Sequence, residues 1–216
     1  MPEVSPVRHL AVDWLELCRR LGARGDVAGA GAALLGRWAE PHRGYHDLAH
    51  LDEVLARVGV LEGEAFDADA VRLAAWFHDA VYDPTAGDNE EHSAELATTS
   101  LSGLDLPPAL VAEAARLVRL TATHDVAPGD ANGAVLCDAD LAILASNGLR
   151  YASYVEGVRR EYAHVDDAAF AAGRAAVLAR LMKRQALFHT GHGHARWERA
   201  ARANVTAELR DLGDGC

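Results

Sequence analysis

Histidine stands directly before aspartate at three places in the chain, and one of these pairs falls in a strongly apolar setting. His78 and Asp79 follow the stretch Leu-Ala-Ala-Trp-Phe at 73–77, which is typical of a buried helix. A buried imidazole and a buried carboxylate need partners, because removing an unpaired charge from water is costly. A divalent cation would satisfy both groups, since imidazole nitrogen and carboxylate oxygen bind Mn, Mg, Fe, Ni, Co or Zn to different degrees. The pair therefore predicts a metal site.

Further potential ligands lie on both sides of this pair. His46 and His50 are four residues apart, a spacing that places both imidazoles on one face if the segment is helical. Asp138 and Asp140 stand at the start of an apolar segment that is expected to be a helix over 139–147. The order of histidine, then histidine with aspartate, then aspartate is what a four-ligand site built from three helices requires. Such a site forms only when the helices pack together.

Helices are also what the rest of the chain predicts. Alanine, leucine and arginine favour helix, and no run of alternating β-branched residues suggests a strand. A first helix ends before Gly22, and a cap at Asp47 begins the third. The other expected helices cover 28–38, 69–79, 90–102, 108–123, 139–147, 151–162, 167–187 and 195–209. The four tryptophans are expected to lie in the core, so the sequence predicts a single all-α domain over 1–216.

Composition and charge disfavour several classes of protein. The 216 residues carry 21 basic and 32 acidic side chains, a formal net charge of −11. This excess of acid disfavours bulk nucleic acid and anionic membranes as partners, because clustered basic residues bind both. We find no apolar run long enough for a membrane span, no signal-peptide pattern at the N-terminus and no CxxC pair among the three cysteines. A cytoplasmic protein is therefore expected, and the preference for arginine over lysine favours a bacterial origin.

Six motifs together resemble one known family. In order they are YHDLAHL at 45–51, AAWFHDAVYD at 74–83, NEEHSAELA at 89–97, DADLAIL at 138–144, GRAAVLARLMKR at 173–184 and ERAARANV at 198–205. From about Trp38 to Leu209, the chain resembles the HD-domain superfamily of metal-dependent phosphohydrolases, and within it a group of predicted bacterial members. The resemblance implies an HD-domain helical bundle, with a core over about 38–165 and C-terminal helices over about 166–209 packed on it.

The resemblance implies four metal ligands, which are His50, His78, Asp79 and Asp140. Asp140 is aligned with the last ligand of the family in preference to Asp138, which would then cap the helix or hold a ligand in place. His46 is a candidate for a contact to a ligand or to substrate, or is a simple surface residue. His124 is a candidate for the same contacts or for binding a second ion. One divalent ion, or two, is therefore expected.

The activity that the resemblance implies is hydrolysis of the phosphate ester of a small metabolite or nucleotide by water that a metal ion activates. The candidates for the general acid or base are Asp83, Glu90 and Glu91. The two glutamates suit a solvated helix start equally well. The candidates for contacts to phosphate are Arg174, Lys183 and Arg184, since arginine can make bidentate bonds to phosphate oxygens. Arg174 suits a salt bridge equally well.

Two other functions fit the same sequence. Some proteins of HD fold hold two irons and activate oxygen, which needs additional ligands such as His124. Others bind or sense nucleotides without turnover. The histidines His189, His192 and His194 favour a flexible turn over a metal site, because the segment around them resembles a loop. The sequence leaves the oligomeric state open.

Overall fold

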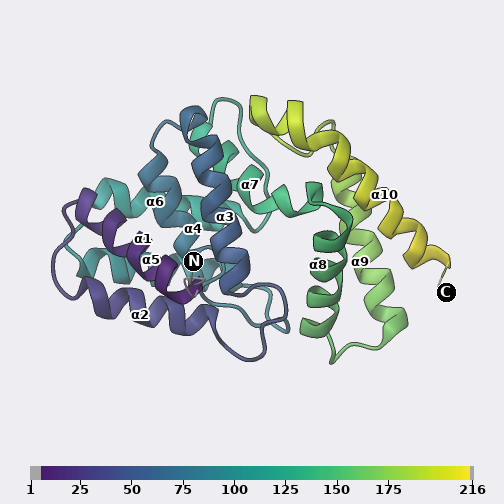
Figure 1. The fold of residues 1–216 in the computed structure, drawn as a ribbon, viewed down its shortest axis with the longest axis horizontal. Coiled ribbons are helices and arrows are strands. Elements are labelled where there is room, and N and C mark those ends of the chain that lie inside the picture. The colour runs from purple at the N-terminus through teal and green to yellow at the C-terminus, as the bar shows by residue number, and fades with distance from the viewer. Residues whose placement is uncertain (1–5, 215–216) are drawn as a thin grey trace, which may run out of the picture.

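The fold is entirely helical in the computed structural model, which describes residues 6–214. Within this range there are ten α-helices and no strand (Figure 1), which confirms the all-α prediction. The helices are α1 (Pro6–Arg20), α2 (Val27–Trp38), α3 (Leu48–Leu61), α4 (Ala68–Phe77), α5 (Asn89–Gly103), α6 (Pro108–Leu120), α7 (Ala131–Leu141), α8 (Gly148–Glu161), α9 (Asp167–Met182) and α10 (Glu198–Asp214). Two 3-10 turns, η1 (Glu62–Glu64) and η2 (Ala142–Ala145), follow α3 and α7, and a π-helical turn, η3 (Gly193–Trp197), leads into α10.

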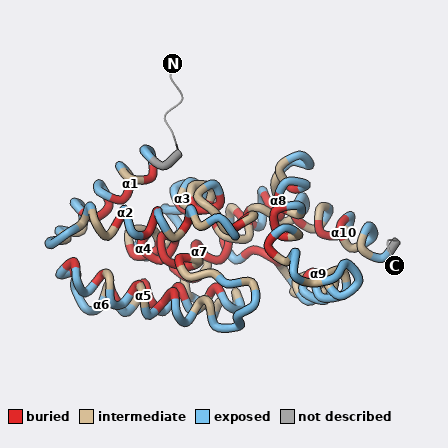
Figure 2. Tube along the Cα trace, turned by 90° about the horizontal axis from the view of Figure 1, so that it is seen from below, coloured by how far each residue is buried: buried red, intermediate tan, exposed pale blue. Residues whose placement is uncertain are grey.

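The helices form a layered body with a second group beside it. Figure 2 shows the buried helices α4 and α7 between α1, α2 and α3 on one side and α5 and α6 on the other. Helices α8, α9 and α10 form the second group, at the other end of the molecule in Figure 1. The turn η2 links α7 to this group and contacts both α8 and α10. None of the helices within residues 6–214 is long and apolar enough to cross a membrane.

Helix α4 lies at the centre because its sequence is apolar on nearly every face. The side chain of Asp67 caps it by accepting hydrogen bonds from two backbone nitrogens of its first turn. Seven of its ten residues are buried, and a helix that is apolar all round is stable only when other elements cover it. The buried core extends from α1 to Val205 in α10 and contains, as predicted, the four tryptophans Trp14, Trp38, Trp76 and Trp197.

One expected helix differs from the observed one at its beginning. Of the segment expected over 139–147, only the first three residues lie in α7, which already begins at Ala131, where the Asp130 side chain caps the first turn, and 142–145 form the 3-10 turn η2. Asp138 and Asp140 therefore stand in the last turn of a helix, and the prediction that they begin one is wrong. The other helices agree with their expected ranges to within a few residues, except that α9 ends earlier.

Helices α1 and α2 approach closely where α2 carries a glycine. A Cβ atom on Gly31 would lie 2.4 Å from Cδ1 of Trp14 and 2.8 Å from its Nε1. The same Nε1 donates a hydrogen bond of 2.8 Å to the carbonyl oxygen of Val27. By contrast, a Cβ atom on Gly36, further along α2, would meet nothing within 4 Å. Alanine at Gly36 therefore changes helix propensity alone, whereas alanine at Gly31 also changes the packing against Trp14.

We expect Gly31→Ala and Gly36→Ala to change stability in opposite directions. At Gly36, alanine should raise the free energy of unfolding by about 0.5–1 kcal/mol, because alanine favours helix. At Gly31, overpacking against Trp14 should lower it by about 1–3 kcal/mol. Urea denaturation followed by circular dichroism measures both changes. Equal gains in the two variants would contradict the close contact between α1 and α2.

Candidate metal centre

Three helices of the layered body bring the predicted ligands to one point. His50 lies in α3, and the Asp47 side chain caps this helix, as predicted, by accepting hydrogen bonds from the backbone nitrogens of its first turn, including that of His50. His78 and Asp79 directly follow α4, and Asp140 lies in the last turn of α7. His50 and His78 are each 1% exposed. The four side chains thus meet inside the protein, although they are far apart in the sequence.

The ligand atoms converge on a small volume. Nε2 of His50 lies 3.2 Å from Nε2 of His78 and 3.2 Å from Oδ1 of Asp140. Oδ2 of Asp79 lies 3.2 Å from Nε2 of His78 and 3.7 Å from Nε2 of His50. With metal–ligand bonds of about 2.1 Å, neighbouring ligand atoms lie about 3.0–3.5 Å apart. The donor set and its spacing therefore fit a divalent cation. Within residues 6–214, His50, His78 and Asp140 form the group whose ligand atoms all lie within 4.8 Å of one another, and Asp79 is not part of that group although its Oδ2 lies near both imidazoles.

The surroundings of His78 leave its inner nitrogen able to bind a cation. Nδ1 of His78 lies 2.9 Å from the carbonyl oxygen of Ala75, and because a carbonyl can only accept, Nδ1 donates. In the neutral ring, Nε2 then carries the lone pair and faces the cluster. Trp38 packs against the rings of His78 and His50 at centroid distances of 5.4 and 6.2 Å. Its Nε1 donates to the carbonyl oxygen of Trp76 at 3.0 Å, so the core holds both imidazoles in place.

The cluster concentrates negative charge. Burial raises the pKa of Asp140, but hydrogen bonds from His124, His50 and His78 outweigh burial and hold that pKa well below its ordinary value. Burial also raises the pKa of Asp79, and the charge and hydrogen bond of His78 lower it overall. Both carboxylates are therefore ionised at neutral pH. Buried anions need compensating positive charge, which a divalent cation or a protonated His78 can supply.

His124 supports Asp140 from the side away from His50. Its Nε2 lies 2.8 Å from Oδ2 of Asp140, whereas His50 faces Oδ1. His124 has a φ of 54°, in the left-handed region that residues other than glycine rarely occupy. Arg184 fixes this turn by donating to the carbonyl oxygens of Thr123 and His124 at 2.6 and 3.0 Å. The strained turn places the imidazole where it can orient Asp140 or bind a second ion.

Glu161 of α8, which no sequence motif marks, organises the segment before α3. Its Oε1 accepts hydrogen bonds of 2.8–2.9 Å from the backbone nitrogens of Gly44, Tyr45 and His46. Its Oε2 lies 2.8 Å from Nδ1 of His46 and accepts from the hydroxyl of Tyr82 at 2.9 Å. Burial raises the pKa of Glu161, but the bonds from His46 and the backbone lower it to about 2. Since the backbone partners are 115–117 residues away, spacing in the sequence gives no signal for Glu161.

Asp138 ties α7 to the segment before α10. Its carboxylate accepts hydrogen bonds of 2.7–3.0 Å from the backbone nitrogens of His189 and Thr190 and from the hydroxyl of Thr190. Burial raises the pKa of Asp138, although the bonds from Thr190 oppose the rise. The geometry therefore places Asp140, and not Asp138, in the cluster.

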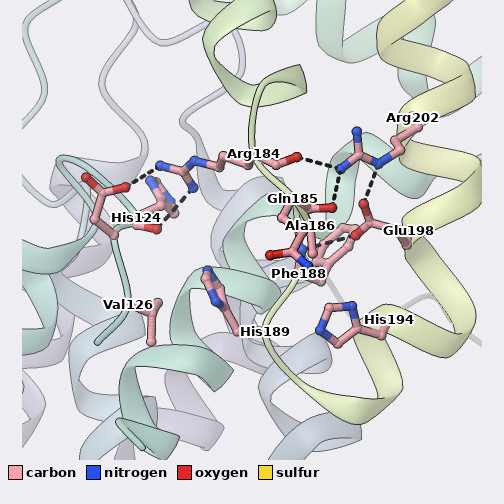
Figure 3. Close-up of a pocket in the computed structure, with 11 residues that line it drawn as sticks. His124, Val126, Arg184, Gln185, Ala186, Phe188, His189, His194, Glu198 and Arg202 are labelled. Atoms are coloured by element: carbon pink, nitrogen blue, oxygen red, sulfur yellow. Dashed lines mark hydrogen bonds and ion pairs between the residues drawn. The ribbon is translucent and has the colours of Figure 1, made fainter. Parts of the chain in front are cut away.

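The segment with three histidines is helical from Gly191 onward, so the expectation of a flexible turn is wrong for most of it. The Thr190 hydroxyl accepts a hydrogen bond from the backbone nitrogen of Gly193 at 2.9 Å and so caps this helix. His189 and His194 border a pocket of about 850 Å³ (Figure 3). Figure 3 also shows that Arg184 and Arg202, which line the same pocket, are bound by protein groups. Among the described residues, these histidines belong to no group of ligand atoms like that at His50.

The three carboxylates that the sequence offers as the general acid or base lie outside the cluster and the cavity beside it. Asp83 accepts hydrogen bonds from the backbone nitrogen and the hydroxyl of Thr85 at 2.8 and 2.7 Å. Glu91 pairs with Arg119 through two contacts of 2.6 Å. Glu90 stands in the first turn of α5. None of the three carboxylates belongs to the walls of the cavity that lies beside the cluster.

That cavity has a volume of about 550 Å³. Asp140, His46 and His124 form part of its wall, so a cation held by Asp140 would lie at its edge. Most of the remaining wall comes from η2, α8, α9 and the residues next to them. It is largely apolar and includes Leu141, Ile143, Leu144, Val158, Phe170 and Leu181.

Three arginines line the cavity, and they differ in what they bind. Arg174 donates to the carboxylate of Glu208 and to the hydroxyl of Tyr154, each at 2.7 Å. Arg184 is bound to the turn at His124, as described above. The side chain of Arg180 makes no hydrogen bond or ion pair with another residue in the range 6–214. Lys183 is exposed and lies outside the wall.

Arg180 was not among the residues selected from the sequence, yet it is the lining arginine that is free to bind a ligand. The available signal was its position four residues before Arg184, a spacing that would place both on one face of the helix expected over 167–187, although α9 itself ends at Met182.

Comparison of the chain with protein-family models, with curated proteins and with solved structures gave no match.

We expect divalent cations to stabilise the protein through this cluster. Adding Mn²⁺ to protein freed of metal with a chelator should raise Tm. A ligand that binds only the folded state stabilises it by about 2.7 kcal/mol at a hundredfold excess over Kd. His78→Ala should abolish the shift. His92→Ala, which removes an exposed imidazole beside Asp88 and Glu95, should retain it. An undiminished shift in His78→Ala, measured by scanning calorimetry, would show that the cation binds elsewhere.

Glu161→Gln should destabilise the protein in a manner that depends on pH. We expect a loss of about 2–3 kcal/mol at pH 7, because the amide group of glutamine faces donors that need an acceptor. The pKa of Glu161 is lowered from 4.5 to about 2. The ionised carboxylate therefore stabilises the fold fully above pH 4.5, and this contribution is lost as the pH falls toward 2. Urea denaturation at several pH values should show the difference between wild type and variant shrinking in that range. A difference that does not change with pH would contradict this role.

Proposed function

We propose that the protein is a metal-dependent phosphohydrolase that cleaves the phosphate ester of a small molecule. The observation that carries this proposal is the position of Asp140. It belongs both to the cluster with His50 and His78 and to the wall of the cavity. A ligand in the cavity would therefore reach a cation held by the cluster. The resemblance of the sequence to HD-domain phosphohydrolases supports the same class of reaction.

The residues that would hold the cation are His50, His78, Asp79 and Asp140. Their mixed nitrogen and oxygen donors suit Mn, Fe, Co, Ni or Zn better than Mg, which prefers oxygen ligands. When bound, a divalent cation polarises a phosphoryl oxygen and makes a coordinated water more acidic. His124 keeps Asp140 oriented for this role through the 2.8 Å contact to its outer oxygen.

Side chains in the wall would bind the substrate and supply a proton. Arg180 can donate two parallel hydrogen bonds to phosphoryl oxygens. His46 lines the cavity, and because Glu161 occupies its Nδ1, its Nε2 can hold a proton near the leaving oxygen. Burial lowers the pKa of His46, but the hydrogen bond to Glu161 and the charge of Asp79 raise it overall. We therefore propose His46 for proton transfer, because Asp83 and the glutamates of α5 do not line the cavity.

The position of His124 favours a second candidate function, an oxygenase with two irons. Its contact with Asp140 would let the two side chains share a second ion. Iron content together with a requirement for oxygen would identify this reaction, whereas turnover of phosphate esters without oxygen would exclude it. A nucleotide sensor, the third alternative, would bind nucleotides tightly without cleaving them.

The test is a hydrolysis assay of the full chain on phosphomonoesters and nucleotides, with Mn²⁺, Co²⁺, Ni²⁺, Zn²⁺, Fe²⁺ or Mg²⁺ added. We expect at least one ester to be cleaved. His78→Ala and Asp79→Ala should lower turnover by about a thousandfold and remove the bound metal, because both hold the cation. Circular dichroism should show that helix content is kept. Retained turnover in both variants would place the active site elsewhere, and no cleavage with any metal would refute the proposal.

The same assay, applied to arginine variants, tests where the phosphate group of the substrate binds. Arg180→Gln should lower kcat/KM by about 10- to 100-fold, the value of a hydrogen bond to a charged group. Arg199→Gln, which removes an exposed arginine of α10 that does not line the cavity, should leave it unchanged.

A further inference from the structure

The cavity beside the cluster is far larger than a phosphate group needs. Its volume of about 550 Å³ lies within the range of cavities that enclose most of a drug-sized ligand. If the phosphate of the substrate lies at Asp140, most of the cavity remains for the organic part of the ester. The chemistry of the remaining wall therefore indicates what that organic part is.

The wall away from the cluster is apolar and comes from three elements. The turn η2 contributes Ile143 and Leu144, and α8 contributes Val158. Helix α9 contributes Val177 and Leu181, which are four residues apart and so lie on one face. Such a wall is favourable for hydrocarbon and gives no hydrogen bonds to a sugar.

Two hydroxyl groups in this part of the wall, those of Thr121 and Tyr154, already have partners. The hydroxyl of Thr121 donates to the carbonyl oxygen of Val118 at 2.7 Å. The hydroxyl of Tyr154 accepts from Arg174, whose guanidinium is bound to Glu208. A sugar or a base placed here would bury hydroxyl or amide groups without partners, which is costly.

The hydroxyl of Tyr45, which also lines the cavity, has no hydrogen-bond partner in the structure. This oxygen is itself buried, so a ligand in the cavity cannot reach it without movement of the wall.

We infer that the substrate is a phosphate monoester whose organic group is mainly hydrocarbon, such as an alkyl chain, and that it is neither a sugar phosphate nor a nucleotide. This inference rests on the proposed function for the phosphate end, and on the cavity wall alone for the organic end. The hydrocarbon would lie along the α9 face that carries Val177 and Leu181. The phosphate would lie between Asp140 and Arg180.

A glycine on the same face of α9 provides a direct test. Gly173 lines the cavity four residues before Val177, and a Cβ atom on it would meet nothing within 4 Å. Gly173→Leu should therefore place its Cβ without a clash, occupy part of the cavity with the rest of its side chain and favour helix at the same time. Gly36→Leu in α2 is the matched control, because its Cβ would also meet nothing and it lies outside the cavity.

The experiment measures binding of methyl-, butyl- and octylphosphonate to the full chain with Mn²⁺ by calorimetry. These phosphonates are not cleaved, so the measurement does not depend on activity. We expect affinity to rise by up to about fourfold per methylene. Ribose 5-phosphate and adenosine monophosphate should bind more weakly than octylphosphonate. Gly173→Leu should weaken octylphosphonate by about tenfold, equivalent to losing roughly two methylene contacts, and leave methylphosphonate unchanged. Gly36→Leu should match wild type, and neither variant should lower Tm.

The outcomes separate this inference from the proposed function. Ester hydrolysis without any dependence of affinity on chain length would overturn the inference and leave the phosphohydrolase proposal standing. Tighter binding of ribose 5-phosphate or adenosine monophosphate than of octylphosphonate would also overturn the inference and leave the phosphohydrolase proposal standing. A steep dependence on chain length, lost in Gly173→Leu, supports the inference even if no ester is cleaved, in which case the proposed reaction alone fails.

Discussion

Two carboxylates and two imidazoles share one buried point, and the electrostatics of that point constrain the whole molecule. Asp79 and Asp140 are ionised although water scarcely reaches them, so the fold needs positive charge there to remain stable. Because the ligands come from α3, α4 and α7, the site exists only when the layered body is packed. The Trp38 ring, which lies against both imidazoles, makes the core itself part of the candidate metal site.

Two further buried charges hold the backbone around this point. Arg43 is 8% exposed and donates to the carbonyl oxygens of His46 and Asp79 at 2.7 and 2.8 Å, so it joins the segment before α3 to the turn after α4. Glu161 holds the same segment from α8 through three backbone nitrogens. The second group of helices is thereby coupled to the ligand geometry, although it contributes no ligand to the cluster. Charge and hydrogen bonding, together with apolar packing, connect the two groups of helices.

Local pattern predicted part of this arrangement, and tertiary contacts decided the rest. The cap at Asp47 and the apolar run before His78 are signals within a single helix, and both helices formed where expected. The helix that carries Asp140 begins at a different cap, and its burial from both sides hides the periodicity that would mark its start. Glu161 has no local signal, because its partners are distant in the sequence. Which arginine can bind a ligand depends on the carboxylates that folding brings near it. Arg174 is not available, because it donates a hydrogen bond to Glu208.

Apart from Asp140, which belongs to both, the cavity and the cluster are built mainly on different helices, and this separation has an evolutionary consequence. Helix α9 supplies one apolar face and Arg180 to the cavity but no ligand to the cluster. The residues of that face are exposed or only partly buried, so they can be exchanged at little cost to the core. Under the proposed function, descendants of this chain would therefore acquire new substrate preferences through changes along one helix, while the residues of the cluster on α3, α4 and α7 are inherited unaltered.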